Sequence, residues 1–254
     1  MFFNSIIAVA ILTYTVSSAP TIMPRVTNST STATVPTKPV STDAIQQLLL
    51  APLAQDRFTT LNDNANFVFD FGAQSLKTAP GGFGGELAAA NRKNFPALIG
   101  SGSGMAVGFL GGCGFNTPHV HPRATELQIV VDGTIVTEMV PENGVMDPKD
   151  PTKRRVIQNT LTKFQMTPFY QGSIHTQFNP SCEPATFIAS FNSEDFGAGQ
   201  VLDETFAFDE QVVSAAFGQA IDGNDVDKFK GKIPATIAKG VMDCLNKCPN
   251  IKRK

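Results

Sequence analysis

The 254-residue chain lacks a charge excess, a long internal hydrophobic run and a helical pattern through its centre. Its 20 Lys and Arg residues nearly balance 22 Asp and Glu residues, so no broad basic surface is available for nucleic acid. Beyond residues 1–19, no apolar stretch is long enough to cross a bilayer as a helix. At 42% hydrophobic, the chain can still bury one substantial core, which favours a single globular domain.

The N-terminus has the composition of an export signal. An apolar run from Ile6 to Leu12 is too short to span a bilayer and is followed by small residues ending at Ala19. We predict a signal peptide over residues 1–19, with cleavage after Ser18 and an uncleaved signal anchor as alternatives. The expected product is a secreted protein, extracellular or in a cell wall, with no transmembrane segment in the mature chain.

The flanks of the main domain differ from it in composition. Residues 20–42 are rich in Thr, Ser, Pro and Val, which predicts a linker of the kind that often carries O-glycans on exported proteins. Asn28 begins the only N-glycosylation sequon, so we expect a glycoprotein. Residues 223–254 are predicted to form a helical, basic C-terminal tail, which leaves residues 43–222 as the main domain.

Short β-type runs separated by turns dominate the main domain. We predict strands near residues 66–71, 105–110, 127–131, 134–140, 156–164 and 186–191. Asp132-Gly133 predicts a two-residue hairpin turn with positive φ at both positions. Helices are expected from Thr42-Asp43 to Leu50, over 209–217 and over 233–245. Consecutive strands without intervening helices predict an all-β barrel or jelly roll with a short C-terminal helical extension, and the lack of an internal repeat predicts one barrel.

The four cysteines, Cys113, Cys182, Cys244 and Cys248, are an even number in a chain predicted to be exported. Two disulfides are therefore expected, with one or both pairs reduced as the alternative, and three pairings are open. Cys244 and Cys248 are close enough in sequence to pair locally, which would leave Cys113 to pair with Cys182. A thiolate metal site is the less attractive use of these residues, because the histidines have a carboxylate at a spacing better suited to binding a metal.

Histidine is scarce, and its placement is informative. The chain has three histidines, and His119 and His121 form an i, i+2 pair whose side chains would project from the same face of a strand. Glu126 can add a carboxylate oxygen, and His175, from an opposing strand, a third imidazole. Three nitrogens and one oxygen leave room for water or substrate on an octahedral ion. We predict that these residues bind one divalent transition metal, which acid should release because ligation needs neutral imidazoles. The alternative is a buried histidine cluster, or a degenerate site, that holds no metal.

Two segments around these residues resemble the two motifs of the cupins in their germin form. Gly112 to Gly133 contains the His-x-His pair, the Glu and the hairpin glycine of the first motif. Pro168 to Asn179 resembles the second, with Gly172 four residues after Pro168 where the usual gap is two. The chain is thus identified as a member of the germin-like and spherulin-like cupins, and the likeness spans roughly residues 45–220.

The resemblance implies a cupin jelly roll, secretion, and manganese at the four-ligand site, with iron or zinc as alternatives. It also implies homo-oligomers, trimers or hexamers, that assemble through the C-terminal helices. Known germin-like activities are superoxide dismutation and oxalate oxidation, so a small anion is the expected substrate. Oxalate-oxidising germins place two asparagine amides near the substrate. Asn116 matches one and is the candidate catalytic residue, with a simple turn residue as the alternative, but residues 103–109 contain no second Asn. Dismutation is therefore the preferred activity.

Two non-catalytic interpretations stay open. The slime-mould spherulins are made during encystment, which implies a coat or stress protein whose folded barrel is stabilised by the bound metal. The other interpretation is a sugar or small-ligand binding module whose pocket is lined by phenylalanines that would otherwise be core. The candidate lining residues are Phe109, Phe115, Phe164, Phe169, Phe178 and Phe187.

Overall fold

The computed structural model describes residues 40–72, 84–230, 232–234, 236–239 and 241–251. The predicted signal peptide, the Asn28 sequon, most of the predicted linker and the end of the basic tail lie outside these ranges. Contacts divide the chain into residues 1–34 and residues 35–254, and the fold below is that of the second unit. The domain boundaries at residues 42 and 222 stay predictions.

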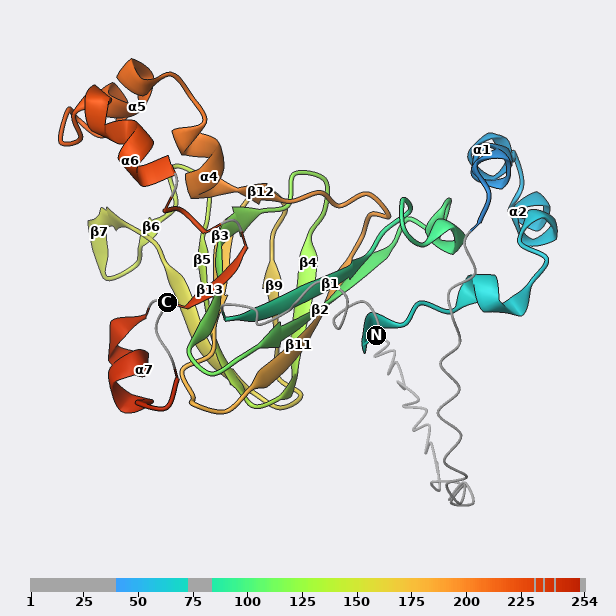
Figure 1. The fold of residues 1–254 in the computed structure, drawn as a ribbon, viewed down its shortest axis with the longest axis horizontal. Coiled ribbons are helices and arrows are strands. Elements are labelled where there is room, and N and C mark those ends of the chain that lie inside the picture. Colours follow the sequence, from blue (N-terminus) through green and yellow to red (C-terminus); the bar gives the residue numbers. More distant parts are fainter. Residues whose placement is uncertain (1–39, 73–83, 231, 235, 240, 252–254) are drawn as a thin grey trace, which may run out of the picture. The chain divides into compact units, whose positions relative to one another are not determined.

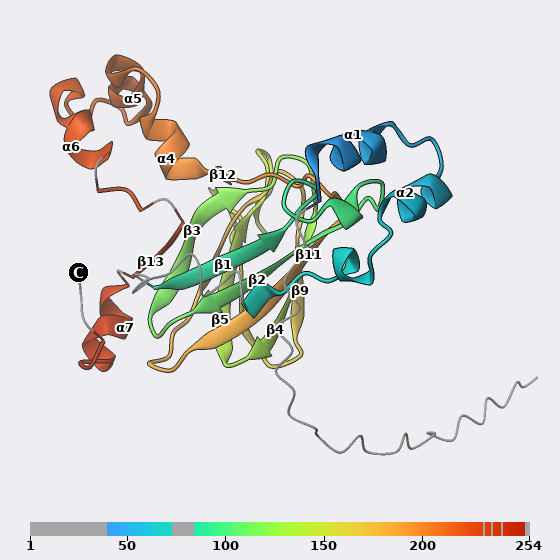
Figure 2. The same ribbon diagram turned by 45° about the vertical axis from the view of Figure 1, so that its right-hand side comes forward.

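Two antiparallel sheets form a jelly-roll barrel (Figure 1 and Figure 2). The first sheet contains, in spatial order, β1 (Gly85–Ala90), β2 (Gly104–Leu110), β11 (Ala185–Phe191), β4 (Glu126–Asp132) and β9 (Met166–Phe169). The second contains β12 (Gly199–Gln200), β3 (Gly114–Val120), β10 (Ile174–Phe178), β5 (Thr134–Val140) and β8 (Ile157–Thr162), with β13 (Ile237–Lys239) also paired to β3. β6 (Met146–Asp147) and β7 (Asp150–Arg154) form a separate small sheet. The predicted all-β jelly roll is confirmed.

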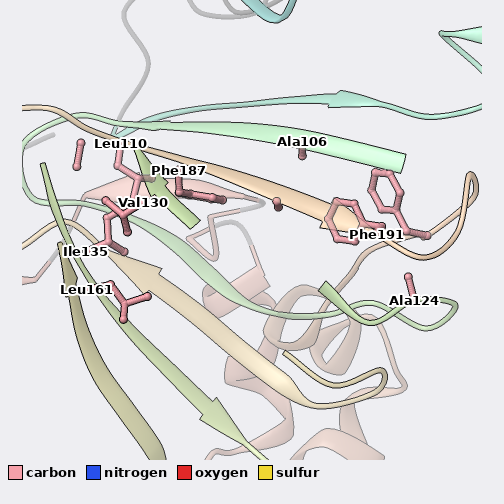
Figure 3. Close-up of a cluster of buried hydrophobic side chains, with 11 residues drawn as sticks. Ala106, Leu110, Ala124, Val130, Ile135, Leu161, Phe187 and Phe191 are labelled. Carbon is pink, nitrogen blue, oxygen red and sulfur yellow. The ribbon is translucent and has the colours of Figure 1, made fainter. Parts of the chain in front are cut away.

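Alternate residues of strands from both sheets fill the barrel interior. Along β5 and β11 every second residue is buried, as expected for strands that pack one face on a core. At the apolar end of the interior, Leu110, Val130 and Phe187 of the first sheet meet Ile135 and Leu161 of the second (Figure 3). This packing fixes the separation of the two sheets and therefore the width of the polar end, where the histidines lie.

Short helices precede and follow the barrel strands in the sequence. They are α1 (Thr42–Leu50), α2 (Ala54–Thr60), α4 (Val201–Phe206), α5 (Glu210–Ala216), α6 (Val226–Lys230) and α7 (Met242–Lys247), with 3-10 turns η1 (Asn64–Phe67), η2 (Pro96–Leu98) and η3 (Gly223–Asp225). Helices α4, α5 and α6 pack around Phe206, Val213 and Val226, which gives the expected C-terminal helical extension its own small core. Within the described ranges, no helix has the length and hydropathy of a membrane span.

Both disulfides join the C-terminal segment to the barrel. Cys113, which precedes β3, pairs with Cys244 in α7, and Cys182 pairs with Cys248 at the end of that helix. The local Cys244–Cys248 closure considered from sequence is therefore wrong. Cys244 bonds to the loop between β2 and β3, and Cys248 bonds to the loop between β10 and β11, although the two cysteines are only one helical turn apart.

Most predicted elements have a counterpart in the structure. The strands expected near residues 105–110, 127–131, 134–140, 156–164 and 186–191 are β2, β4, β5, β8 and β11. The helices expected over 42–50 and 209–217 are α1 and α5, and the side chain of Ser41, rather than Thr42, caps α1 by accepting a hydrogen bond from the Ala44 amide.

The predicted hairpin at Asp132-Gly133 is wrong, because β4 and β5 belong to different sheets. β4 pairs with β9 and β11, whereas β5 pairs with β8 and β10. The turn thus carries the chain from one sheet to the other, and only Gly133 has a positive φ, at 75°. The Asp-Gly pattern predicts a local change of chain direction, but it does not determine whether the two flanking strands pair with each other.

Two other elements were predicted wrongly. Residues 64–67 form a 3-10 turn, capped by the side chain of Asp63, where a strand over 66–71 was expected. The predicted helix over 233–245 is replaced by β13 and the short helix α7. β13 forms because the edge of β3 between Gly114 and Asn116 offers unpaired backbone groups, and this tertiary pairing outweighs a weak local helical preference.

Candidate metal centre

The three histidines and Glu126 come together at one end of the barrel. His119 on β3 and His175 on β10 are direct partners in the antiparallel pairing, so they lie on neighbouring strands and not on the opposing strands that we expected. His121 follows β3 by one residue, on the same face as His119. Glu126 begins β4 in the other sheet. The cluster therefore bridges the two sheets.

The geometry of the cluster is that of a convergent ligand set. The four side chains are buried, with exposed fractions of 2–5%, and each offers one ligand atom within 4.8 Å of the others. Among the described residues, the other such grouping of His, Cys, Asp or Glu consists of Cys113, Cys244 and Cys248. Those cysteines are all in disulfides, so they offer no thiolate.

Each imidazole is oriented by a main-chain carbonyl. The Nδ1 atoms of His119, His121 and His175 lie 2.8, 2.6 and 2.9 Å from the carbonyl oxygens of Thr117, Gly197 and Ser173, respectively. Because a carbonyl oxygen can only accept, each Nδ1 carries the proton and donates it. In the neutral ring, the lone pair is then on Nε2, the atom that faces the cluster.

The Nε2 atoms meet a carboxylate oxygen. Nε2 of His121 lies 2.9 Å from Oε2 of Glu126, and Nε2 of His175 lies 3.1 Å from the same oxygen. Two neutral imidazoles and a carboxylate would place lone pair against lone pair, so a cation or protons must lie among them. Ligand atoms at right angles around an ion with bonds of about 2.1 Å are roughly 3 Å apart, and these separations match that value. The residues present therefore fit a divalent metal.

The protonation states favour metal binding. Burial alone would raise the pKa of Glu126, but where protons lie between the imidazoles and the carboxylate in place of a cation, the hydrogen bonds with His121 and His175 outweigh burial and lower the pKa from 4.5 to about 2. Burial, assisted by the nearby His175, lowers the pKa of His119 from 6.5 to about 3. At neutral pH the carboxylate is ionised and the His119 ring is neutral, as ligation requires.

Aromatic side chains hold the histidine rings from outside the cluster. The ring of Phe169 stacks on His175, with centroids 4.2 Å apart and an angle of 14° between the planes. Phe191 and Phe196 contact His121 edge to face, at 4.7 and 5.8 Å. These apolar contacts keep the rings in one orientation and reduce access of bulk water to the cluster.

A cavity of about 380 Å³ leads from the cluster toward the surface. Its polar end contains His119, His121 and Glu126, and its walls are largely apolar. The apolar wall is formed by Leu87, Ala89, Ala106, Phe187, Ala189, Phe191 and Phe196. Besides Glu126, the charged residues that line it are Arg92, Lys93 and Asp195. A small molecule can therefore reach the cluster.

Asn116 lines this cavity as well. It lies within β3 and is 2% exposed, so its interpretation as a turn residue is wrong. Its Nδ2 lies 3.5 Å from Nε2 of His119 and donates to Oε1 of Gln177 at 3.0 Å, whereas its Oδ1 has no protein partner. Asn116 thus presents an amide oxygen that a water or another hydrogen-bond donor can satisfy.

Gln177 is a site residue that the sequence reasoning missed. It is fully buried on β10, two residues after His175, and its Nε2 lies 3.5 Å from Oε1 of Glu126. The i, i+2 relation to His175, the same signal that linked His119 to His121, identifies it in retrospect.

The proposed phenylalanine pocket does not form as a unit. Of its six candidates, Phe187 lines the cavity, Phe169 stacks on His175, and Phe164 is 71% exposed. Phe115 and Phe178 line a separate groove with Val136, on the outer face of the second sheet. The sheet that each strand joins, and not the residue type, decides which ring reaches the interior.

The comparisons with known proteins agree with this geometry. Residues 77–226 match the model of the Cupin family. The chain is 36% identical to spherulin-1A of Physarum polycephalum over 214 residues, which cover 84% of this chain and 82% of that protein. It is 29% identical to the putative germin-like protein 3-2 of Oryza sativa subsp. japonica over 175 residues, covering 68% and 74% of the two chains. A solved structure of recombinant oxalate oxidase with glycolate matches with a TM-score of 0.58 at 20% identity, over 68% of this chain and 84% of that one.

A β-barrel with a buried cluster of three histidines and one glutamate at one end defines the class of protein. The chain belongs to the cupin family, and its curated relatives include the spherulins and the germin-like proteins.

Proposed function

We propose that the chain is a manganese-binding germin-like cupin that acts on a small anion, with superoxide dismutation as the preferred activity. His119, His121, Glu126 and His175 hold the ion. The observation that carries the proposal is the pair of Nε2 atoms at 2.9 and 3.1 Å from one buried carboxylate oxygen, an arrangement that requires positive charge among them.

The donor set and the family together favour manganese. Three imidazole nitrogens and one carboxylate oxygen suit manganese, iron or zinc, and intrinsic affinity alone would favour the later metals of the series. The resemblance to the germins favours manganese. Because intrinsic affinity does not, metal supply during folding decides which ion is bound. Iron and zinc are the alternatives.

A bound manganese ion would supply one-electron cycling between two oxidation states. The overall dismutation converts two superoxide ions and two protons into one dioxygen and one hydrogen peroxide. The chain contributes a cavity that reaches the cluster, Arg92 and Lys93 to attract an anion, and the NH2 groups of Asn116 and Gln177 to donate hydrogen bonds to it. Asn116 is thus the proposed catalytic residue.

Oxalate oxidation is the less favoured activity. Oxalate oxidase is a fold neighbour at low identity and is seen with glycolate, so small oxygen anions fit this type of barrel. Strand β2 nevertheless places Ala106 in the cavity wall, and none of its residues is the second asparagine that the activity calls for. The cavity therefore offers one asparagine amide where oxalate oxidation calls for two.

A structural role is the second candidate, and the relationship to spherulin-1A favours it. Here the metal acts as a staple: an ion that binds only the folded state stabilises the barrel according to its affinity and supply. The two disulfides, which join residues 131 and 66 positions apart, serve the same purpose.

The remaining features of the proposal concern export and assembly. We propose secretion to the extracellular space or cell wall after cleavage of a signal peptide, with glycans on the linker, and the two disulfides suit an oxidising compartment. Assembly into trimers or hexamers through the C-terminal helices is supported by exposed apolar side chains on and beside α4 to α6. These are Leu202, Phe208, Val212, Phe217 and Phe229.

Metal analysis of two matched variants tests the proposal. Glu126→Gln changes the inward carboxylate at the start of β4, whereas Glu138→Gln makes the same change on β5, where Glu138 pairs with Gln158 and lines the outer groove. Purified wild type and E138Q should contain near-stoichiometric manganese by plasma mass spectrometry, and E126Q should contain little. Wild type without metal would contradict the proposal.

Superoxide assays then separate the two candidates. Turnover that rises with manganese content, and is lost in E126Q and in a His119→Ala, His175→Ala double variant, supports the enzyme. Full manganese occupancy without turnover, combined with a lower unfolding temperature after chelation, supports the structural role.

A further inference from the structure

A loop of the barrel reaches the candidate metal centre from outside. The strap, defined as residues 192–198, connects β11 to β12 and lines the cavity through Asp195, Phe196, Gly197 and Ala198. Its Gly197 carbonyl accepts the 2.6 Å hydrogen bond from Nδ1 of His121. The carbonyls that orient the other two histidines come from two residues earlier on the same strand or its approach, so His121 alone depends on a distant segment.

The strap requires a glycine where it meets the histidine. Gly197 has a φ of +67°, and a Cβ at this position would lie 2.6 Å from Nη2 of Arg123. Preceding it, Phe196 stacks on Phe191 with ring centroids 3.9 Å apart. The positive φ of Gly197 and its close approach to Arg123 therefore favour a residue without a side chain.

Asp195 anchors the strap to two separate parts of the barrel. Its carboxylate accepts from Nη2 of Arg92 at 3.1 Å through Oδ2 and from Nη2 of Arg123 at 3.0 Å through Oδ1. Nε of Arg123 also donates to the Asp195 carbonyl at 2.7 Å, and the Arg92 amide donates to the Glu194 carbonyl at 2.9 Å. Arg92 follows β1, and Arg123 lies between His121 and Glu126, so the carboxylate fixes the strap relative to the ligand-bearing segment.

These ion pairs are too exposed to serve mainly as stabilising contacts. Side-chain exposures are 46% for Arg92, 45% for Asp195 and 53% for Arg123. Exposed pairs contribute little to folding free energy, but a carboxylate held by two planar guanidinium groups has a defined orientation. The contribution of Asp195 is therefore one of position.

We propose that Asp195 is a positioning residue of the metal centre. It holds the strap so that the Gly197 carbonyl fixes the tautomer, orientation and basicity of the His121 ring. The inference rests on the proposed metal binding and adds a residue outside the ligand set that tunes it. Removal of an interaction that orients a metal-bound histidine typically weakens metal affinity about 10- to 100-fold.

The test compares Asp195→Asn with Asp150→Asn. Both replace an exposed aspartate that forms ion pairs, but Asp150 lies on β7 and pairs with Lys153, away from the cavity-lining residues. Manganese titration followed by electron paramagnetic resonance should give a dissociation constant about 10- to 100-fold higher for D195N than for wild type, with D150N unchanged. High salt, which screens the exposed pairs, should weaken manganese binding by wild type and D150N more than by D195N.

A second readout works on the metal-free protein. Because the chain has three histidines, nitrogen-15 spectra resolve each ring, and D195N should change the Nδ1–H signal of His121 while leaving His119 and His175 as in wild type. Equal manganese affinity and an unchanged His121 signal in D195N would overturn the proposal, as would a fall in the urea midpoint large enough to account for the lost affinity. If wild type binds no manganese, the proposed metal centre is wrong, whereas an unchanged His121 signal in D195N contradicts the role of Asp195.

Discussion

Acidification of the metal-free protein should lower its free energy of unfolding through His119 before the Glu126 carboxylate is protonated. Burial, assisted by His175, lowers the pKa of His119 from 6.5 to about 3. The unfolded chain therefore takes up a proton as the pH falls below about 6.5, whereas the folded chain takes it up only near pH 3. The stability that this difference provides is present above the unfolded pKa and is lost as the pH falls toward the folded one.

The size of the loss follows from the width of this window. Each pH unit between the two pKa values corresponds to about 1.4 kcal/mol, so a change from about pH 7 to about pH 4.5 should cost about 2.5 kcal/mol through His119. Burial would raise the pKa of Glu126, but the hydrogen bonds with His121 and His175 lower it from 4.5 to about 2, so its contribution is lost mainly below about pH 4.5, where the unfolded carboxyl takes up its proton. Down to about pH 4.5 the contribution of Glu126 is therefore small beside that of His119, and comparison with a His119 variant isolates the histidine.

Urea unfolding across this pH range provides the assay. Chelator-treated wild type should lose stability with a slope that exceeds that of His119→Gln by about 1.4 kcal/mol per pH unit, or one proton. Asn116→Ser is the matched control, because it alters a neighbour of the His119 ring without removing a titratable group, and it should keep the wild-type slope. Equal slopes for wild type and H119Q would refute the claim that burial keeps His119 neutral.

Three further predictions concern the barrel. Replacing both Cys113 and Cys244 with Ala removes a cross-link over 131 residues and should lower the urea unfolding free energy by about 5 kcal/mol if chain entropy dominates; an unchanged midpoint would contradict this. In Gly108→Ala the new Cβ would lie 2.1 Å from the ring of Phe187, so we expect a loss of about 1–3 kcal/mol in calorimetry, and a neutral result would mean that the ring can move freely. Asn179→Ala leaves three main-chain carbonyls without their side-chain donor and should cost at least about 2 kcal/mol by the same measurement, a value near zero being the opposing result.

Much of the barrel could be predicted because alternation is a local property. The runs that became β4, β5 and β11 alternate buried and less buried residues, and that pattern is written in each strand separately. Pairing is not local: the turn at Gly133 predicted a hairpin, yet its two strands pair with other strands in different sheets. The same reason explains β13, whose residues form a strand only because the edge of β3 is available.

The candidate site divides in the same way. The sequence by itself determined the four ligand types and the shared face of His119 and His121, because an i, i+2 spacing in a strand fixes the direction of both side chains. Only the tertiary structure decided that Glu126 crosses from the other sheet to within 2.9 Å of His121, and that Gly197, 76 residues away, supplies the carbonyl that orients this ring. Distances between segments depend on the packing of the two sheets, and no local pattern encodes that packing.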